Sequence, residues 1–222
     1  YGKNFKNNDL KLFSDEIFEL IKISNKKISK SKRKNLKVSE DTTVVICYGD
    51  SVFDNGKLNS IRSFKNQDVS REIIEKILEI SRFAPSGGNT QPWKIYVLNK
   101  KMMKKLESTV LNNLDNGLSE TPNFNIYPQP MSEHLKNRVK ECGKLMYGAL
   151  EIGKDDVEGR LNQLKQNFSF FGAPVGMLVT VEKEVDLNGW GHVGHFIQNI
   201  CLSSMEFGLG TCLQESWSMY PE

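Results

Sequence analysis

Five segments of the chain place apolar residues at the three- and four-residue intervals of an amphipathic helix. They are residues 70–81, 100–114, 135–149, 155–164 and 191–207. Ser70 is suited to cap the first segment, and Gly208 is suited to end the last, whose wide apolar surface predicts burial. A further helix is expected to begin at residues 14–16, because Ile17, Leu20 and Ile21 would then share one face.

Three shorter segments have the composition of buried β-strands. They are residues 42–48, 93–98 and 175–181. The last is apolar at successive positions, which indicates a sheet covered on both sides. Residues 116–130 contain Pro122, Pro128 and Pro130 and are expected to form turns. Helices and strands therefore both contribute, and the chain predicts a mixed α and β domain.

The first forty residues are more polar than the rest of the chain and show little apolar periodicity. The 222 residues suit one domain, 38% of them are hydrophobic, and the formal net charge is +3. We assign residues 1–41 to an N-terminal extension and 42–222 to the folded domain. The basic run over residues 26–37 is interpreted as a solvated linker, because no aromatic residues are interleaved to stack on nucleic-acid bases. A nucleic-acid partner is therefore not expected.

Other features argue against a membrane or metal protein. No apolar run is long enough for a membrane helix, and no apolar signal peptide opens the chain. The cysteines, Cys47, Cys142, Cys201 and Cys212, are scattered, which is typical of reduced, mostly buried thiols in a cytoplasmic protein. His192 and His195 are three residues apart, but no third ligand is evident. We therefore predict no metal, and expect both histidines to face a groove or a partner chain.

Residues 84–93 form the most informative loop of the sequence. Gly87 and Gly88 make the backbone permissive and leave its N–H groups open to close approach. Small hydroxyl and amide side chains surround them, and Pro92 then ends the turn before a strand. Such a helix–loop–strand unit suits a flat polar heterocycle, although an ordinary turn around two glycines has the same pattern.

Several ordered blocks resemble the nitroreductase family of FMN-dependent oxidoreductases, and within it the nitrobenzoate-reductase-like branch. The blocks are residues 60–64, 84–93, 170–175, 194–202 and 208–217. The likeness runs from about residue 52 to residue 222. It implies an α+β nitroreductase-like fold, with a central, mainly antiparallel sheet flanked by helices. It also implies a homodimer with FMN at the interface.

The resemblance implies that NAD(P)H reduces the bound flavin before a small acceptor, such as a nitroaromatic or a quinone, enters the same cleft in a ping-pong cycle. The chemistry is centred on the flavin, so no catalytic amino acid is expected. The residues that match the family's cofactor-binding positions are Ser60, Arg62, Pro85, Ser86, Gly87, Asn89, Gln91, Glu215 and Ser216.

Each of these positions carries an implied role. Ser60 matches the hydroxyl that contacts the flavin phosphate, and Arg62 matches the basic residue that favours reduction at the ring edge. Pro85, Ser86, Gly87 and Asn89 match a loop that lies along the ring and comes from the partner subunit. Gln91 is expected to meet the ribityl chain or the ring. Glu215 and Ser216 match a loop whose backbone N–H points at the flavin N5.

Two departures from the family pattern keep alternatives open. Leu58 and Asn59 stand where the family has a basic pair that grips the phosphate. The family also continues for several tens of residues after residue 222, so either the chain is incomplete or FMN is held weakly. One alternative is a non-catalytic dimer with a decayed flavin site. Another is an SGNH-type esterase that uses Ser51, although no histidine here follows an aspartate by three residues.

Overall fold

The computed structural model describes residues 19–21, 44–49, 58, 60–122, 125–181, 184–185 and 187–220, and for 19–21, 44–49 and 187 it describes the backbone alone. Within this part a five-stranded sheet has the order β1-β3-β4-β2-β5. The strands are β1 Glu19–Ile21, β2 Val44–Gly49, β3 Trp93–Leu98, β4 Val175–Val181 and β5 Gly210–Gln214. Every pair of neighbouring strands is antiparallel, as predicted.

The helix expected from residue 14 is wrong over the residues described. Glu19–Ile21 is strand β1, and Leu20 lies opposite Tyr96 of β3. Three apolar residues span barely one helical turn, whereas pairing with the edge of β3 satisfies the backbone N–H and C=O groups. The predicted linker at residues 26–37 and the residues before 19 lie outside the described residues.

The remaining helices agree with the apolar spacing. They are α1 Arg71–Ser81, α2 Lys100–Asp115, α3 Glu133–Ala149, α4 Val157–Phe168 and α5 Leu187–Glu206. Ser70 caps α1, with its hydroxyl accepting from the Ile73 amide at 3.4 Å. Gly208 follows α5 with a φ of 68° and closes it as predicted, although α5 begins four residues before the expected residue 191.

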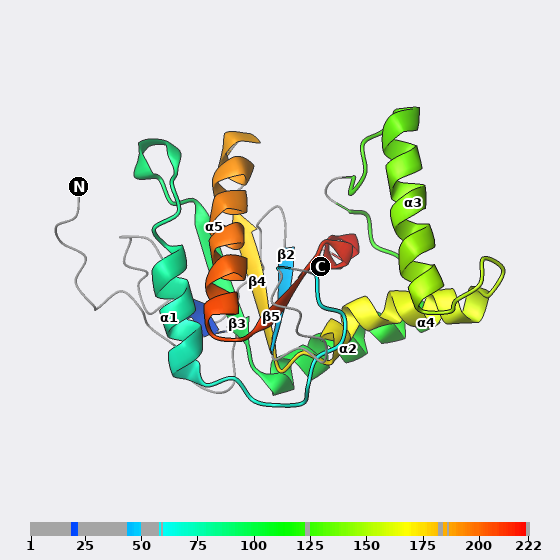
Figure 1. Cartoon of the computed structure of the whole chain (residues 1–222), viewed down its shortest axis with the longest axis horizontal. Coiled ribbons are helices and arrows are strands. Elements are labelled where there is room, and N and C mark those ends of the chain that lie inside the picture. Colours follow the sequence, from blue (N-terminus) through cyan, green and yellow to red (C-terminus); the bar gives the residue numbers. More distant parts are fainter. Residues whose placement is uncertain are drawn as a thin grey trace.

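Helices α1 and α5 lie side by side over one face of the sheet (Figure 1). Their apolar residues pack against those of β3 and β4, and the rings of Trp93 and Phe196 stack with centroids 4.7 Å apart. Ile77, Leu78 and Ile200 are completely buried in this cluster. The long helix α5 is therefore fixed to the sheet along its length, and this anchors the residues on its first turns.

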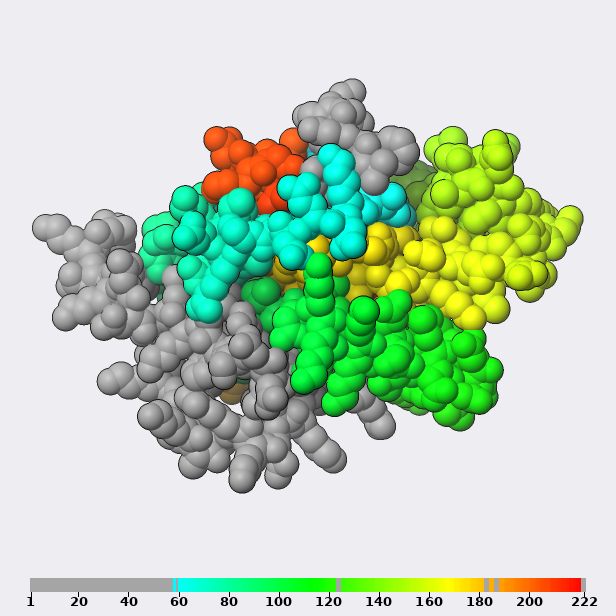
Figure 2. All heavy atoms as spheres, turned by 90° about the horizontal axis from the view of Figure 1, so that it is seen from below, coloured from blue at the N-terminus to red at the C-terminus, as the bar shows by residue number. Residues whose placement is uncertain are grey.

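A second apolar cluster fills the other side of the sheet. Phe168 at the end of α4 contacts the ring of Trp217 edge-on, with centroids 5.4 Å apart. In the view from below, α2 (green) and α4 (yellow) run alongside one another (Figure 2), and Lys165 of α4 pairs with Asp115 of α2 at 2.5 Å. Both faces of β4 are thus covered, as its apolar sequence predicted.

Helix α3 stands apart from this body (Figure 1). None of its residues is buried, and Leu145 is 70% exposed. Its Cys142 is a free, exposed thiol, whereas Cys201 and Cys212 are free and buried, so the prediction of buried cysteines holds for the latter two. The apolar stripe of α3 has the pattern of a packed helix, and within the described chain it is left open to solvent.

Candidate functional site

The loop between α1 and β3 has an unusual backbone. Gly88, Asn89 and Gln91 have φ values of 57°, 55° and 45°, in the left-handed region that side chains other than glycine rarely adopt. The Asn89 amide donates to the Ser86 carbonyl at 2.9 Å, and the Gln91 amide donates to the Ser86 hydroxyl at 3.1 Å. Gly87, Gly88 and Asn89 are exposed, so the loop presents a defined polar surface rather than a bare turn.

A side chain of helix α5 contacts this loop. The Gly87 amide donates to Nε2 of His192 at 3.1 Å. A Cβ atom added to Gly87 would lie 3.1 Å from the same nitrogen, so the glycine permits the close approach. Pro85 is exposed at the start of the loop, and Gln91 at its end is partly buried.

The other predicted residues lie along β5, the strand at the edge of the sheet. The Ile61 amide donates to the Thr211 carbonyl at 2.9 Å, and Ser60 forms a parallel bridge with Thr211. Thr211 is the second residue of β5, and Glu215 follows the end of the same strand. Ser60 and Arg62 are therefore brought to the same strand as Glu215, although they are far apart in sequence.

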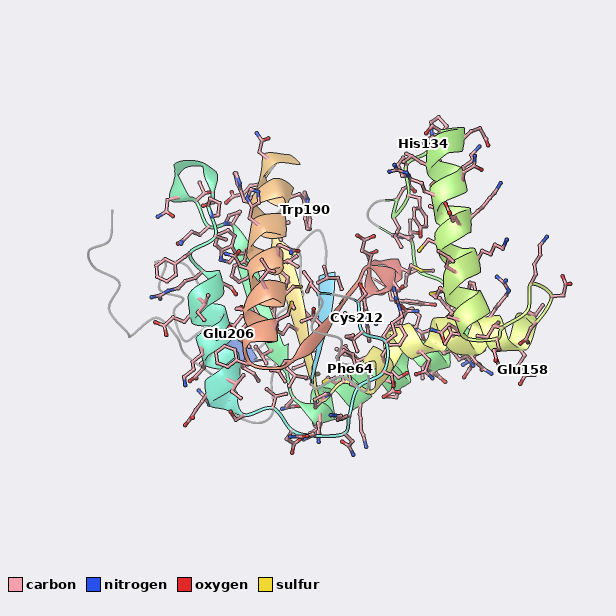
Figure 3. The ribbon with its side chains drawn as sticks, viewed as in Figure 1. Phe64, His134, Glu158, Trp190, Glu206 and Cys212 are labelled. Carbon is pink, nitrogen blue, oxygen red and sulfur yellow. The ribbon has the colours of Figure 1, made fainter. Side chains whose placement is uncertain are left out.

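Arg62 is exposed, and its guanidinium carbon lies 6.0 Å from the centroid of the Phe171 ring. Phe171 is buried with a φ of 52°, in the 3-10 turn η3, Phe170–Gly172. Burial raises the pKa of the neighbouring Cys212 thiol to about 11, and the Arg62 charge works in the opposite direction. The cation thus lies over a buried aromatic ring. Cys212 itself lies on β5 (Figure 3).

Glu215 and Ser216 form the turn into η4, Ser216–Met219. The Glu215 carbonyl accepts from both the amide and the hydroxyl of Ser218, at 2.9 and 2.6 Å. Beside them, buried Gln214 accepts from the Trp217 indole N–H at 3.1 Å through its side-chain oxygen. The amide nitrogen of the same Gln214 side chain has no hydrogen-bond partner among the described residues.

The structure divides the predicted residues into two sets. One set is the loop before β3, residues 85–91, and the other is the group along β5: Ser60, Arg62, Glu215 and Ser216. Strands β4 and β2 lie between β3 and β5, so the two strands are separated by three spacings, about 14 Å in all. In Figure 1 the loop lies near the start of α5, and η4 lies on the opposite side of the sheet. The two sets therefore lie on separate strands of the sheet.

Two residues that contact these sets were not predicted as functional. Phe171 belongs to a block that the resemblance includes, but no periodicity indicates that its ring lies under Arg62. His192 was weighed as a metal ligand, and its contact with Gly87, 105 residues away in sequence, has no local signal. The His192 and His195 rings are 6.5 Å apart between centroids, and no group of three potential metal ligands occurs in the described chain.

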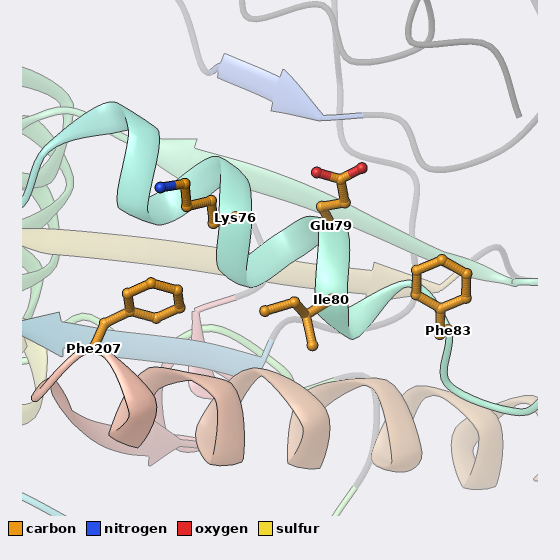
Figure 4. Close-up of a pocket in the computed structure, with 5 residues that line it drawn as sticks. All are labelled: Lys76, Glu79, Ile80, Phe83 and Phe207. Carbon is orange, nitrogen blue, oxygen red and sulfur yellow. The ribbon is translucent and has the colours of Figure 1, made fainter.

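A groove of about 320 Å³ lies between α1 and α5, apart from both sets (Figure 4). Its walls are the apolar side chains of Ile80, Phe83 and Phe207, with Lys76 and Glu79 at the rim. None of the predicted site residues lines it. The described helices also include none with the length and apolarity needed to cross a membrane.

Known proteins share this sequence and fold. Residues 59–220 match the profile of the nitroreductase family. The chain is 35% identical to 4-nitrobenzoate reductase from Pseudomonas putida, over 72% of this chain and 70% of the relative. It is 33% identical to nitrobenzene nitroreductase from Ectopseudomonas oleovorans, over 71% of this chain and 70% of that protein.

Solved structures extend the comparison to three dimensions. The FMN and NADPH-dependent nitroreductase NfnB from sphigopyxis sp. strain HMH superimposes with a TM-score of 0.71 and 33% identity. The match covers 73% of this chain and 74% of that one. NfnB from Mycobacterium smegmatis, solved in complex with NADPH, has a TM-score of 0.69 at 23% identity and supports the fold.

An antiparallel sheet faced by a long central helix, with a Gly-rich loop and an arginine at its far edge, defines the nitroreductase-like fold class. The chain belongs to the nitroreductase family. The resemblance drawn from the sequence is thereby confirmed, as is the predicted enzyme class, an NAD(P)H-dependent nitroreductase-like oxidoreductase, at the level of the family. FMN and NADPH are the cofactors named for the solved relative. The roles of the individual residues and the division at residue 41 stay predictions.

The residues described fit FMN. An exposed guanidinium over an aromatic ring suits the anionic edge of a reduced flavin, and the Ser60 hydroxyl suits a phosphate. The glycine loop, where a Cβ would crowd His192, suits the flat face of the ring system. Leu58 is exposed and supplies no charge to a phosphate, while Asn59 and Ser51 lie outside the described residues.

Proposed function

We propose that the chain is an FMN-dependent oxidoreductase that uses NAD(P)H to reduce small acceptors in a ping-pong cycle, as a homodimer with two flavin sites. The observation that supports this most directly is the division of the predicted residues into two sets on separate strands. A second copy that places its loop against the β5 edge of the first completes one site, and the symmetric contact completes the other.

Bound FMN supplies the redox chemistry, accepting a hydride and passing electrons on, and the protein residues bind and orient it. Arg62 places a permanent positive charge at the ring edge, where negative charge develops. Ser60 donates to the phosphate from a backbone position fixed by the pairing with Thr211. The turn at Glu215 and Ser216 offers its backbone N–H groups, and the Gly87 loop of the other copy covers the ring.

Exposed apolar residues support the homodimer. Phe83, which lines the groove between α1 and α5, is 72% exposed, and Leu202 of α5 is 52% exposed. Helix α3 adds a further apolar stripe with no buried residue. Apolar surface of this extent is more typical of a covered interface than of a monomer.

Nitroaromatics are the acceptors that we propose first. The relatives compared above are named for nitrobenzoate and nitrobenzene reduction. Quinones and similar planar acceptors belong to the same proposal, because an open site over a flavin selects for flatness and redox potential more than for a functional group. The segment over residues 116–130, which contains three prolines and has no regular structure where it is described, is the natural place for selectivity.

A second candidate, a non-catalytic dimer, is favoured by Leu58. This exposed side chain replaces a basic residue, and the loss of one charge-assisted contact weakens phosphate binding by roughly tenfold or more. The two candidates differ in whether the dimer retains the flavin.

Titration with FMN separates the two candidates. The purified full chain should stay yellow after excess FMN is removed by gel filtration, lose its visible flavin absorbance anaerobically with NADPH, and regain it with 4-nitrobenzoate. Free FMN with NADPH is the matched control. A dimer that binds no FMN at any concentration tested would support the non-catalytic candidate instead.

A further inference from the structure

His192, on the second turn of α5, links the Gly-rich loop to the rest of the fold. The amides of Gly87, Asn89, Thr90 and Gln91 all donate hydrogen bonds within the protein. Three of these four bonds close within the loop itself. The bond from Gly87 to Nε2 of His192, at 3.1 Å, reaches another element.

The direction of this bond fixes the protonation of the ring. A backbone amide can only donate, so Nε2 of His192 must be the acceptor and carries no proton. The neutral ring then holds its proton on Nδ1. An imidazolium, with protons on both nitrogens, has no acceptor to offer and would face the Gly87 N–H with a second donor.

We propose that His192 is a positioning residue for the flavin loop. Its imidazole Nε2 accepts from the Gly87 amide and so holds the loop in place. The inference rests on the proposed function, in which one copy presents this loop to the flavin bound by the other copy. Anchoring the loop before binding lowers the entropy lost when FMN binds.

A second histidine lies close to the ring. On α5 the ring of His195 lies 6.5 Å from that of His192 between centroids. His195 is therefore the matched control for substitutions of His192.

Amide exchange in the flavin-free full chain tests the bond itself. His192→Leu removes the acceptor at similar volume, and His192→Gln restores one where Nε2 stood. Exchange of the Gly87 amide, followed by NMR, should be about fivefold faster in His192→Leu, the factor carried by one neutral hydrogen bond. His192→Gln and the control His195→Leu should match the wild type. Equal exchange in the wild type and His192→Leu would overturn the proposal.

FMN titration of the same variants tests the consequence. At a single pH near 8, His192→Leu should bind FMN about fivefold more weakly than the wild type, whereas His192→Gln and the control His195→Leu should match the wild type. A His192→Gln variant as weak as His192→Leu would contradict the proposal. A wild type that binds no FMN refutes the proposed function, and the Gly87 exchange still decides the role of His192.

Discussion

Backbone contacts position Arg62, and its guanidinium lies over an aromatic ring. The pairing of Ile61 with Thr211 fixes the segment along β5, and the guanidinium extends over the Phe171 ring. A guanidinium keeps its charge at any working pH, and its planar fork suits the edge of a flat ring. The exposed cation, the buried ring and the buried Cys212 thiol together form one half of the proposed site.

Replacing Arg62 should weaken the flavin site without unfolding the protein, because the side chain is exposed. We expect Arg62→Ala to lower FMN affinity by roughly tenfold or more and to slow reduction by NADPH. Arg62→Lys should recover part of the affinity, since a lysine keeps the charge but not the fork. Arg71→Ala, which removes an exposed arginine of α1, serves as the control. Unchanged flavin titrations and stopped-flow rates for Arg62→Ala would remove Arg62 from the site.

The two kinds of cysteine should differ in reactivity. Burial raises the pKa of Cys212 to about 11, so its thiol stays protonated and unreactive until the pH approaches that value. Exposed Cys142 should be alkylated more readily than Cys212 under the same conditions, because the reagent can reach its thiol. Peptide mapping after iodoacetamide treatment measures both. Because the Arg62 charge lowers the Cys212 pKa, Arg62→Ala should make Cys212 still slower; rapid labelling of Cys212 in the folded protein would contradict the structure.

The helices and strands show how much of the fold the sequence alone predicts. Helices α1, α2 and α5 and strands β3 and β4 agree with the apolar spacing, because each packs an apolar face that its sequence marks. Strand β1 was missed, because its state depends on the free edge of β3, which no local pattern reports. The exposure of α3 was missed for the converse reason, since its stripe indicates packing without saying where its partner lies.

The candidate site, too, could be predicted only where the sequence has local signals or family likeness. The loop at residues 84–93 has local signals, namely two glycines and small amides, and family likeness identified the rest. The contact of Gly87 with His192 and that of Arg62 with Phe171 join residues more than a hundred positions apart. Contacts at that separation arise from the fold and leave no periodicity in the chain.

Helix α5 should carry much of the stability of the fold. Phe196 is fully buried and stacks on Trp93, so Phe196→Ala removes a ring from a closed cluster. We expect a loss of about 3–5 kcal/mol in the free energy of unfolding, measured by urea denaturation. Gln198→Ala, two residues along on the exposed side, should cost about 0.5 kcal/mol or less. Equal losses for both would mean that α5 does not pack as described.

At the scale of the whole molecule, the central claim is that one flavin site needs two copies of the chain. The loop before β3 and the edge of β5 lie on separate strands of one sheet, and apolar residues remain exposed on α1, α3 and α5. Two incomplete half-sites with an uncovered apolar surface are best reconciled by symmetric pairing.

Complementation in trans measures that claim most directly. Arg62→Ala and Gly87→Val each damage one half-site, so each homodimer should have two defective sites. In a heterodimer of the two variants, one site takes an intact Arg62 from one copy and an intact loop from the other, while the second site takes both defects. Co-expressed and purified through different tags, the heterodimer should recover up to about half the NADPH-dependent nitroreductase rate of the wild type. A heterodimer no more active than either parent would place both half-sites within one chain and contradict the account.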